Sequence, residues 1–292
     1  MLRSALAAFA LSAPGAAMAQ PGDDPFANAR AQRVAIDNYH GDVISPFLAR
    51  DGRTLLYNNR PDGSASSDLL YAVRVTAHSF RFVGPVLGAN SPERDATASM
   101  DRAGRFYFVS ERAYERTLNT LYTAPFAGGT IGELRAVTGL ETREGNRIIA
   151  DAEISGDGRS IYFSDALRFG GDFVWEADLH VARRYGVGVF ARDNRSRAIF
   201  ARINTPDLEY APALSVDERE IYFTRRSRMP FSAPIIMRAA RGDPRIAFGA
   251  PADLRLDGWV ESPSVAADGS VYFSRREDGE YRLWRLPRNP SR

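Results

Sequence analysis

One pattern recurs five times along the chain and limits what it can fold into. In its clearest copy, residues 262–276, a short apolar strand leads into an Asp268-Gly269 turn and a second strand, Val271-Tyr272-Phe273. An Asp-Gly pair between two strand-like runs predicts a β-hairpin. Four earlier copies have the same plan, and each of the five is followed by a third strand-like run. The copies begin near residues 45, 95, 151 and 211, and the third runs are residues 69–75, 121–126, 177–182, 235–239 and 281–286.

The spacing of the copies predicts the architecture. A tyrosine in each second strand marks the period, at Tyr57, Tyr107, Tyr162, Tyr222 and Tyr272, with steps of 50, 55, 60 and 50 residues. Several strands in a unit of about 40 to 50 residues are typical of a propeller blade. Such a sheet has two apolar faces and buries both only by packing between neighbouring blades in a ring.

A fourth strand per blade is less distinct in the sequence. We expect it at residues 80–83, 133–137, 198–201 and 247–248. The last copy ends six residues before the C-terminus without one, so residues 33–36 are expected to join the last blade and close the ring. The prediction is an all-β protein, a single β-propeller of five four-stranded blades. A sixth, degenerate blade is the alternative.

The N-terminus reads as an export signal. Arg3 precedes a short apolar run, and Ala17-Met18-Ala19 forms an A-x-A cleavage site. We therefore expect residues 1–19 to be a signal peptide, 20–32 a flexible leader and 33–292 the propeller domain. The run is too short to span a bilayer. The prediction is a periplasmic or secreted protein, monomeric and without a membrane span.

Composition excludes several kinds of function. The formal net charge is only +2, which does not favour nucleic acid as a partner. There is no cysteine, and the three histidines, His40, His78 and His180, have no metal-ligand spacing. Nucleophile-elbow, P-loop, HExxH and dinucleotide-binding motifs are also absent. We expect neither a metal nor another cofactor.

The repeats resemble the TolB-type β-propeller repeat, in which a strand is followed by S-P-D-G, an aromatic strand and a polar turn. The match is carried by Ser262-Pro263 with Asp268-Gly269, by Asp157-Gly158 with Tyr162, and by Asp51-Gly52 with Leu56-Tyr57. Two copies depart from it, since residues 101–104 suggest a longer turn and Asp217 is followed by Glu218. The resemblance implies an exported scaffold that binds proteins, peptides or glycans.

The aspartates of the turns are expected to be structural. An Asp side chain in a turn accepts a hydrogen bond from the backbone N–H two residues on. We assign this role to one aspartate per repeat: Asp51, Asp101, Asp157, Asp217 and Asp268.

Carboxylates at the inner strands are the first candidates for a site. If these strands surround a channel, some of the five side chains would converge at one mouth: Asp95, Asp151, Glu153, Glu209 and Glu261. They could bind a cation, or Asp151 and Glu209 could act as an acid/base pair on a glycosidic bond. The remaining alternative is that they are solvated or paired with arginine along a water-filled channel.

Arginines that follow the second strands are the other candidates. If they share one rim, they could bind carboxylates or phosphates; otherwise they are solvated turn residues. They are Arg60, Arg112, Arg225, Arg226, Arg275 and Arg276. From these features we predict a non-catalytic exported propeller that binds a protein or cell-envelope component through one rim. The alternative is a carbohydrate-active hydrolase.

Overall fold

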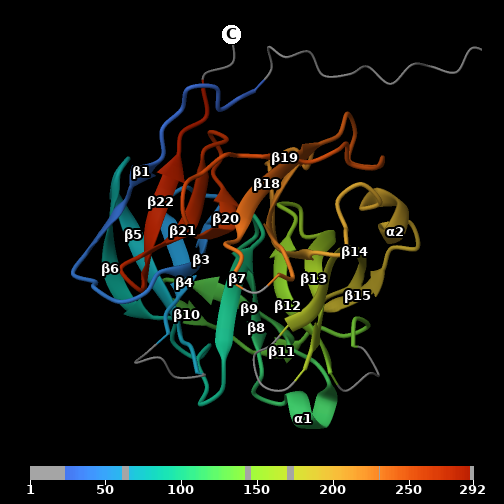
Figure 1. The fold of residues 1–292 in the computed structure, drawn as a ribbon. Coiled ribbons are helices and arrows are strands. Elements are labelled where there is room, and N and C mark those ends of the chain that lie inside the picture. Colours follow the sequence, from blue (N-terminus) through green and yellow to red (C-terminus); the bar gives the residue numbers. More distant parts are fainter. Residues whose placement is uncertain (1–23, 61–65, 142–145, 170–173, 230, 290–292) are drawn as a thin grey trace, which may run out of the picture.

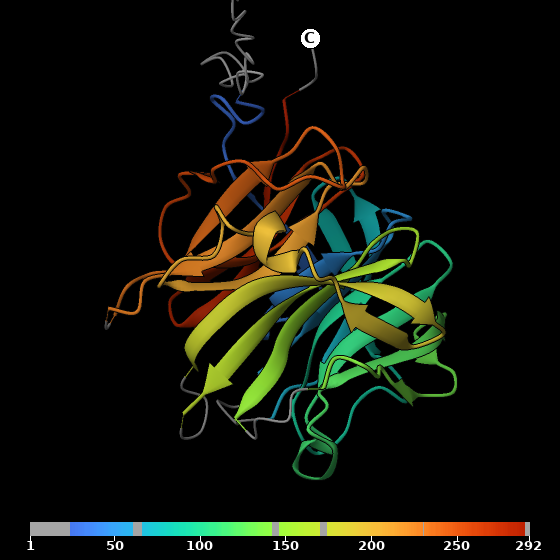
Figure 2. The same ribbon diagram turned by 90° about the vertical axis from the view of Figure 1, so that its right-hand side faces the viewer.

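The chain folds as a five-bladed β-propeller in a computed structural model (Figure 1). The structure describes residues 24–60, 66–141, 146–169, 174–229 and 231–289, so the expected signal peptide lies outside the described residues. Within them the strands form five sheets that surround a common axis, antiparallel except where β2 joins β6, and the view turned by 90° shows the same ring (Figure 2). The all-β prediction with five blades is confirmed.

The first three blades follow the chain in order. Blade 1 consists of β3 (Ile44–Leu48), β4 (Thr54–Asn58), β5 (Leu69–Thr76) and β6 (Ser79–Pro85). Blade 2 consists of β7 (Asp95–Met100), β8 (Arg105–Ser110), β9 (Leu121–Ala127), β10 (Thr130–Ile131) and β11 (Arg135–Ala136), with α1 (Tyr114–Thr117) between β8 and β9. Blade 3 consists of β12 (Arg147–Ile154), β13 (Ser160–Arg168), β14 (Val174–Gly186) and β15 (Val189–Arg192).

Blades 4 and 5 complete the ring. Blade 4 consists of β16 (Leu208–Leu214), β17 (Glu220–Arg226), β18 (Ile235–Ala240) and β19 (Ala252–Asp253), after a short helix α2 (Ser196–Ile199). Blade 5 consists of β20 (Val260–Val265), β21 (Val271–Glu277) and β22 (Glu280–Leu286). No helix in the part of the chain described here is long and apolar enough to cross a membrane.

Two of the expected fourth strands are wrong. Residues 198–201 lie in α2 and the turn after it, and β15 is the outer strand of blade 3. Residues 247–248 are not in a strand, and β19 takes that place in blade 4. Both stretches instead contribute buried apolar side chains, since Phe200 and Phe248 lie together in the core between blades 3 and 4. Burial gives such a segment a strand-like composition without a strand.

The N-terminus closes the ring, as predicted, but in two steps. Strand β1 (Gln32–Arg33) pairs antiparallel with β22 and becomes the fourth strand of blade 5 (Figure 1). The next residues cross to blade 1, where β2 (Ala35–Asp37) pairs in parallel with β6. The N-terminal segment therefore links the last blade to the first, which removes an open sheet edge.

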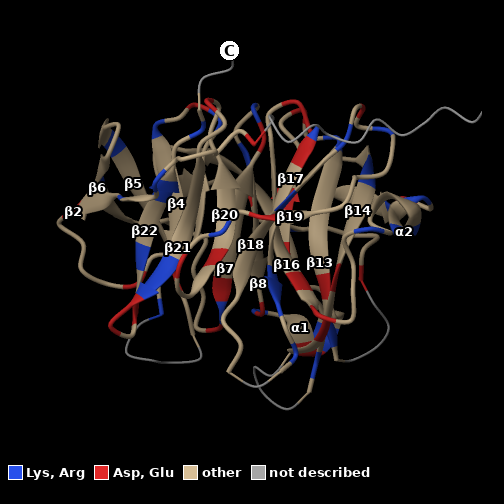
Figure 3. Cartoon of the chain, turned by 45° about the horizontal axis from the view of Figure 1, so that its top comes forward, with Lys and Arg blue, Asp and Glu red and all other residues tan. Residues whose placement is uncertain are grey.

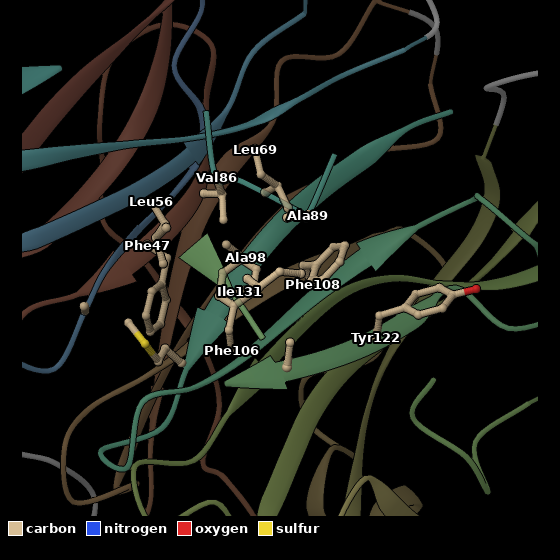
Figure 4. Close-up of a cluster of buried hydrophobic side chains, with 13 residues drawn as sticks. Phe47, Leu56, Leu69, Val86, Ala89, Ala98, Phe106, Phe108, Tyr122 and Ile131 are labelled. Carbon is tan, nitrogen blue, oxygen red and sulfur yellow. The ribbon is translucent and has the colours of Figure 1, made fainter. Parts of the chain in front are cut away.

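Each second strand sends alternate side chains into the two neighbouring cores, because successive residues of a strand point to opposite faces. Tyr162 packs between blades 3 and 4, whereas the adjacent Phe163 packs between blades 2 and 3. Figure 4 shows the core between blades 1 and 2, where Leu56 lies near Phe106 and Phe108. All of these side chains are almost fully buried.

In the first blade, Tyr57 is not the counterpart of the other repeat tyrosines, because the equivalent position is one residue earlier. Leu55 pairs with Leu48 just as Ile161 pairs with Ile154, so Leu56 is the counterpart of Tyr162. Tyr57 points to the opposite face and packs between blades 5 and 1. A shift of one residue reverses the face of a strand, and the sequence offered no marker of the register at Leu56-Tyr57.

The turn aspartates hold the turns, as predicted. In each repeat the aspartate Oδ1 accepts the backbone N–H two residues on, from Arg53, Ala103, Arg159, Arg219 and Ser270. The second turn is not longer than the others, because Gly104 bonds back to Asp101 as Gly158 does to Ser155. Glu218 takes the left-handed backbone (φ 57°) that Gly158 has in blade 3. Its carboxylate accepts a hydrogen bond from Tyr162 at 3.0 Å.

The described part of the expected leader packs against the propeller. Phe26 is buried edge-on against Tyr222, and the tail residue Asn289 donates a backbone hydrogen bond to Pro25. Arg288 and Arg238 both bond Glu220 at the start of β17, and the Arg288 guanidinium lies 6.0 Å from the centroid of the Phe26 ring. Burial raises the pKa of Glu220, but the bonds from these two arginines outweigh it and lower the pKa to about 2.

Glu220→Gln is therefore expected to destabilise the protein in a pH-dependent way. A carboxyl whose folded pKa is lowered stabilises the fold above its ordinary value near 4.5, and that stability is lost as pH falls toward 2. The free energy of unfolding should fall by about 2 kcal/mol at pH 7, and the gap to wild type should close between pH 5 and 2. Urea titrations at several pH values measure this. Glu133→Gln, which breaks a solvent-exposed pair with Arg135, is the control and should change little. A gap that does not vary with pH would contradict the assignment.

Candidate functional site

A cavity of about 720 Å³ opens at one mouth of the central channel. Every blade contributes to it through its inner strand. The lining residues at these positions are Ser45 in β3, Thr97 in β7, Asp151 in β12, Tyr210 in β16 and Glu261 in β20. The ring thus gathers side chains that are up to 216 residues apart in the sequence, from Ser45 to Glu261.

The backbone of the inner strands is irregular at this mouth. The register shifts in all five, and four of them carry a residue with positive φ at matching positions, Ser45, Thr97, Ala211 and Ser262. Asp151 occupies the matching position of β12, next to that strand's own bulge. Bulges re-aim side chains, and left-handed non-glycine residues cluster at functional sites. This backbone therefore singles out the mouth as the candidate site.

Glu261 is the central acceptor of the cavity. The indole N–H of Trp259 donates to Oε1 at 3.0 Å, and the Tyr210 hydroxyl donates to Oε2 at 2.8 Å. Burial, then the charge of Glu261, raises the pKa of Tyr210 and of Tyr281, so both phenols remain protonated donors. No ion pair joins Glu261 to any described arginine. Both oxygens of Glu261 thus accept a hydrogen bond from a neutral donor.

Asp151 is the second carboxyl of the cavity. Its Oδ2 accepts hydrogen bonds from the Ser164 hydroxyl at 3.2 Å and from the Ala211 N–H at 3.3 Å. Burial raises the pKa of Asp151 to about 6, with a further contribution from the charge of Glu261, and these two bonds only partly offset it. Near pH 6 Asp151 is thus half protonated, which allows one carboxyl to donate while its neighbour accepts.

Glu209 in blade 4 and Asp95 in blade 2 lie at positions equivalent to each other, and both are outside the cavity. Both are fully buried. The hydroxyl and backbone N–H of Thr205 bond Glu209 at 2.6 and 3.0 Å, and Arg225 donates to it at 2.8 Å. Ser91 and Arg112 hold Asp95 in the same way.

This arrangement is a structural latch that occurs in blades 2 and 4. Its sequence is Asn-Ser-Pro-x-x-Asp at residues 90–95 and Asn-Thr-Pro-x-x-Glu at residues 204–209. The asparagine side chain bonds both backbone groups of a third-strand residue, Leu69 or Leu179. Asp151 and Glu209 therefore do not share the cavity, and the carboxyl pair that does is Asp151 with Glu261.

Glu153 lies further along the channel. Its carboxylate pairs with Arg50 at 2.6 Å, and both side chains are nearly buried. Glu153 also accepts the N–H of Leu214 at 3.2 Å. Because Arg50 follows β3 and Glu153 lies in β12, this bond crosses the ring from blade 1 to blade 3 and narrows the channel beyond the cavity.

The predicted arginines divide into three groups. Arg60, Arg226 and Arg276 line the cavity. Arg112 and Arg225 belong to the latches, and Arg275 lies over Trp284, 4.6 Å from the ring centroid, and does not line the cavity. Around the ring, acidic and basic segments are interspersed at both ends (Figure 3). Among the described residues no group of three metal-ligating side chains converges.

Aromatic residues of the cavity were missed by sequence reasoning. Trp259, Tyr210, Tyr281 and Trp175 line it beside the carboxyls. Two of them carried a usable signal, because Tyr210 directly precedes the positive-φ residue of β16 and Trp259 lies two residues before Glu261. Trp175 and Tyr281 lie on other strands, and only folding brings them to the mouth.

Comparisons with known proteins bear on the fold alone. No protein-family model matches the chain, and no curated protein matches it. A structure titled glycoside hydrolase is similar at 12% identity, over 90% of this chain and 92% of that one, with a TM-score of 0.59. A putative exo-β-1,3-galactanase from Bifidobacterium bifidum s17 has 12% identity, 90% and 94% coverage and a TM-score of 0.58. TolB from Acinetobacter baumannii is more distant, at 16% identity, 85% and 54% coverage and a TM-score of 0.44.

Proposed function

We propose that this protein is an exported, monomeric propeller that binds a saccharide of the cell envelope in the mouth cavity. The observation that carries the proposal is the lining: Trp259, Tyr210 and Tyr281 stand beside Asp151 and Glu261. Aromatic faces cover the apolar faces of sugar rings, and a few fixed polar groups orient the hydroxyls. The cavity is large enough for a small ligand. Two proteins of the same fold are named for action on glycans.

A glycan panel tests this proposal. The chain from Gln20 onward would be titrated by calorimetry with neutral and acidic oligosaccharides, and in parallel used to capture partners from an envelope extract before and after glycan digestion. We expect millimolar to micromolar binding of at least one saccharide and capture that digestion removes. Capture that survives digestion, with no binding on the panel, would favour a protein partner and overturn the saccharide proposal.

Hydrolysis is a second candidate, favoured by the two carboxyls of the cavity. Asp151, with a pKa of about 6, has the protonation range of a general acid, and Glu261 is the second carboxyl that such a mechanism requires. On this mechanism Asp151 would protonate the glycosidic oxygen while Glu261 activates water or attacks the anomeric carbon.

If hydrolysis occurs, Asp151→Asn and Glu261→Gln should each lower kcat by about 10²- to 10⁴-fold while saccharide binding persists. The wild-type rate should fall as pH rises above about 6, because Asp151 then loses the proton that it must donate. Reducing-end release over pH 4–8 measures both effects. Asp243→Asn, in an exposed turn, is the control. Release that is unchanged in both variants would exclude this pair as the catalytic residues.

A further inference from the structure

Two arginines converge beside the tryptophan of the cavity. Arg226 ends β17 of blade 4, and Arg276 is near the end of β21 of blade 5. Their guanidinium carbons lie 5.1 and 5.9 Å from the centroid of the Trp259 ring. A guanidinium within about 6 Å of an indole is attracted to the ring and loses part of its freedom before any ligand arrives. The two cations are therefore held in place at one edge of the cavity.

Neither arginine has an anionic partner among the described residues. Most other arginines near buried carboxylates are paired, as Arg225 is with Glu209 and Arg238 with Glu220. The guanidinium of the half-buried Arg226 makes no hydrogen bond to a described residue, and that of the exposed Arg276 makes one long bond, at 3.4 Å, to the carbonyl of Gly279. Glu261, an acid of the same cavity, is already bonded by Trp259 and Tyr210. The guanidinium donors of both arginines are thus free to bind an anionic ligand, and those of the half-buried Arg226 are partly shielded from water.

We propose that Arg226 and Arg276 select saccharides that carry a carboxylate, and that they hold this group against the edge of Trp259. The inference rests on the proposed saccharide function and names its ligand class. The planar guanidinium matches a carboxylate in a two-bond, side-by-side geometry. Arg60 and Arg228 also line the mouth and add positive charge, whereas Asp151 and Glu261 would repel an acid that entered in the opposite orientation. The sugar would thus be oriented with its acid toward blades 4 and 5.

A matched set of ligands tests the carboxylate directly. Short oligogalacturonides, their methyl esters and neutral galacto-oligosaccharides would be titrated by calorimetry at pH 7 in 50 and 300 mM salt. We expect the acid form to bind at least tenfold more tightly than the ester at 50 mM, and this preference to shrink at 300 mM salt. A sulfated oligosaccharide is included because its anion is tetrahedral and should bind less tightly than the carboxylate.

Variants tie the preference to the two arginines. Arg226→Ala and Arg276→Ala should each remove most of the acid-over-ester preference and leave the affinity for the ester nearly unchanged. Arg275→Ala is the matched control, since it lies on the same strand as Arg276 but contacts Trp284, and it should keep the preference. Circular dichroism and the melting temperature check that each variant is folded.

The outcomes separate this inference from the proposed function. Equal binding of acid and ester, tighter binding of the sulfated ligand, or a preference that survives in both arginine variants would overturn the carboxylate assignment. Binding of neutral sugars alone would overturn it too, while the saccharide function stands. If none of these ligands nor any member of the wider panel binds, the proposed function itself fails.

Discussion

Arg225→Ala is expected to lower the free energy of unfolding by about 3–5 kcal/mol, because it leaves the Glu209 carboxylate buried without its cation. Arg225 is bonded to Glu209 at 2.8 Å and to the Ile203 carbonyl at 2.6 Å, and the exposed surface of Glu209 is 0%. The loss would remove a large part of the stability of an ordinary domain. Urea unfolding followed by tryptophan fluorescence measures it.

Three further variants sharpen this prediction. The double variant Arg225→Ala/Glu209→Leu removes both charges, so it should recover much of the loss. Arg112→Ala should behave like Arg225→Ala, since Arg112 pairs with Asp95 in the corresponding latch of blade 2 at 2.7 Å. Arg275→Ala should change the stability by less than about 1 kcal/mol. A loss below about 1 kcal/mol in Arg225→Ala would show that the latch does not stabilise the fold and would reopen a functional role for Glu209.

Trp259→Ala is expected to weaken saccharide binding by about 30-fold or more, which corresponds to the 2 kcal/mol or more that a central tryptophan contributes to many binding sites. The change removes the aromatic face of the cavity, one of the two donors to Glu261 and the ring beside Arg226 and Arg276. Calorimetry with the best ligand of the panel measures it. Trp259→Phe keeps a ring but loses the indole N–H, so an intermediate affinity is expected.

The control for this prediction is Phe231→Ala. Phe231 is 96% exposed and does not line the cavity, so its loss tests whether any exposed aromatic ring of this region supports binding. We expect its affinity to equal that of wild type. If Trp259→Ala binds as tightly as wild type while remaining folded, the mouth cavity is not the saccharide site.

Most of the fold could be predicted from local patterns in the sequence. The Asp-Gly turns, the aromatic second strands and the missing fourth strand of the last repeat each reflect interactions within one hairpin or one sheet, so they can be read residue by residue. The pairing of β1 with β22 was expected because the last repeat lacks a fourth strand of its own. Where a stretch is buried without being a strand, as at Phe200 and Phe248, composition misled, because burial and strand formation favour the same residues.

The candidate site was only partly predictable for a related reason. Asp151, Glu261, Arg60, Arg226 and Arg276 were expected near one mouth, and all five line the cavity. Asp95 and Glu209 lie one residue before the repeat position of Glu261 and face the latches; their shared Asn-Ser/Thr-Pro-x-x-acid sequence was the available signal, but it does not by itself show which way the strand turns the carboxylate. A bulge of one residue decides this, and bulges depend on the contacts of the whole ring.

By itself, the sequence determined the repeat unit, the number of blades, the turn geometry at each Asp and the closure by the N-terminal strand, since each depends on short-range periodicity and on chain length. The tertiary structure alone decided the register at Leu56-Tyr57, the pairing of Arg225 with Glu209, and the meeting of Asp151 with Glu261, Tyr210 and Trp259. These contacts join different blades or opposite faces of one strand, so their geometry exists only once the ring has closed.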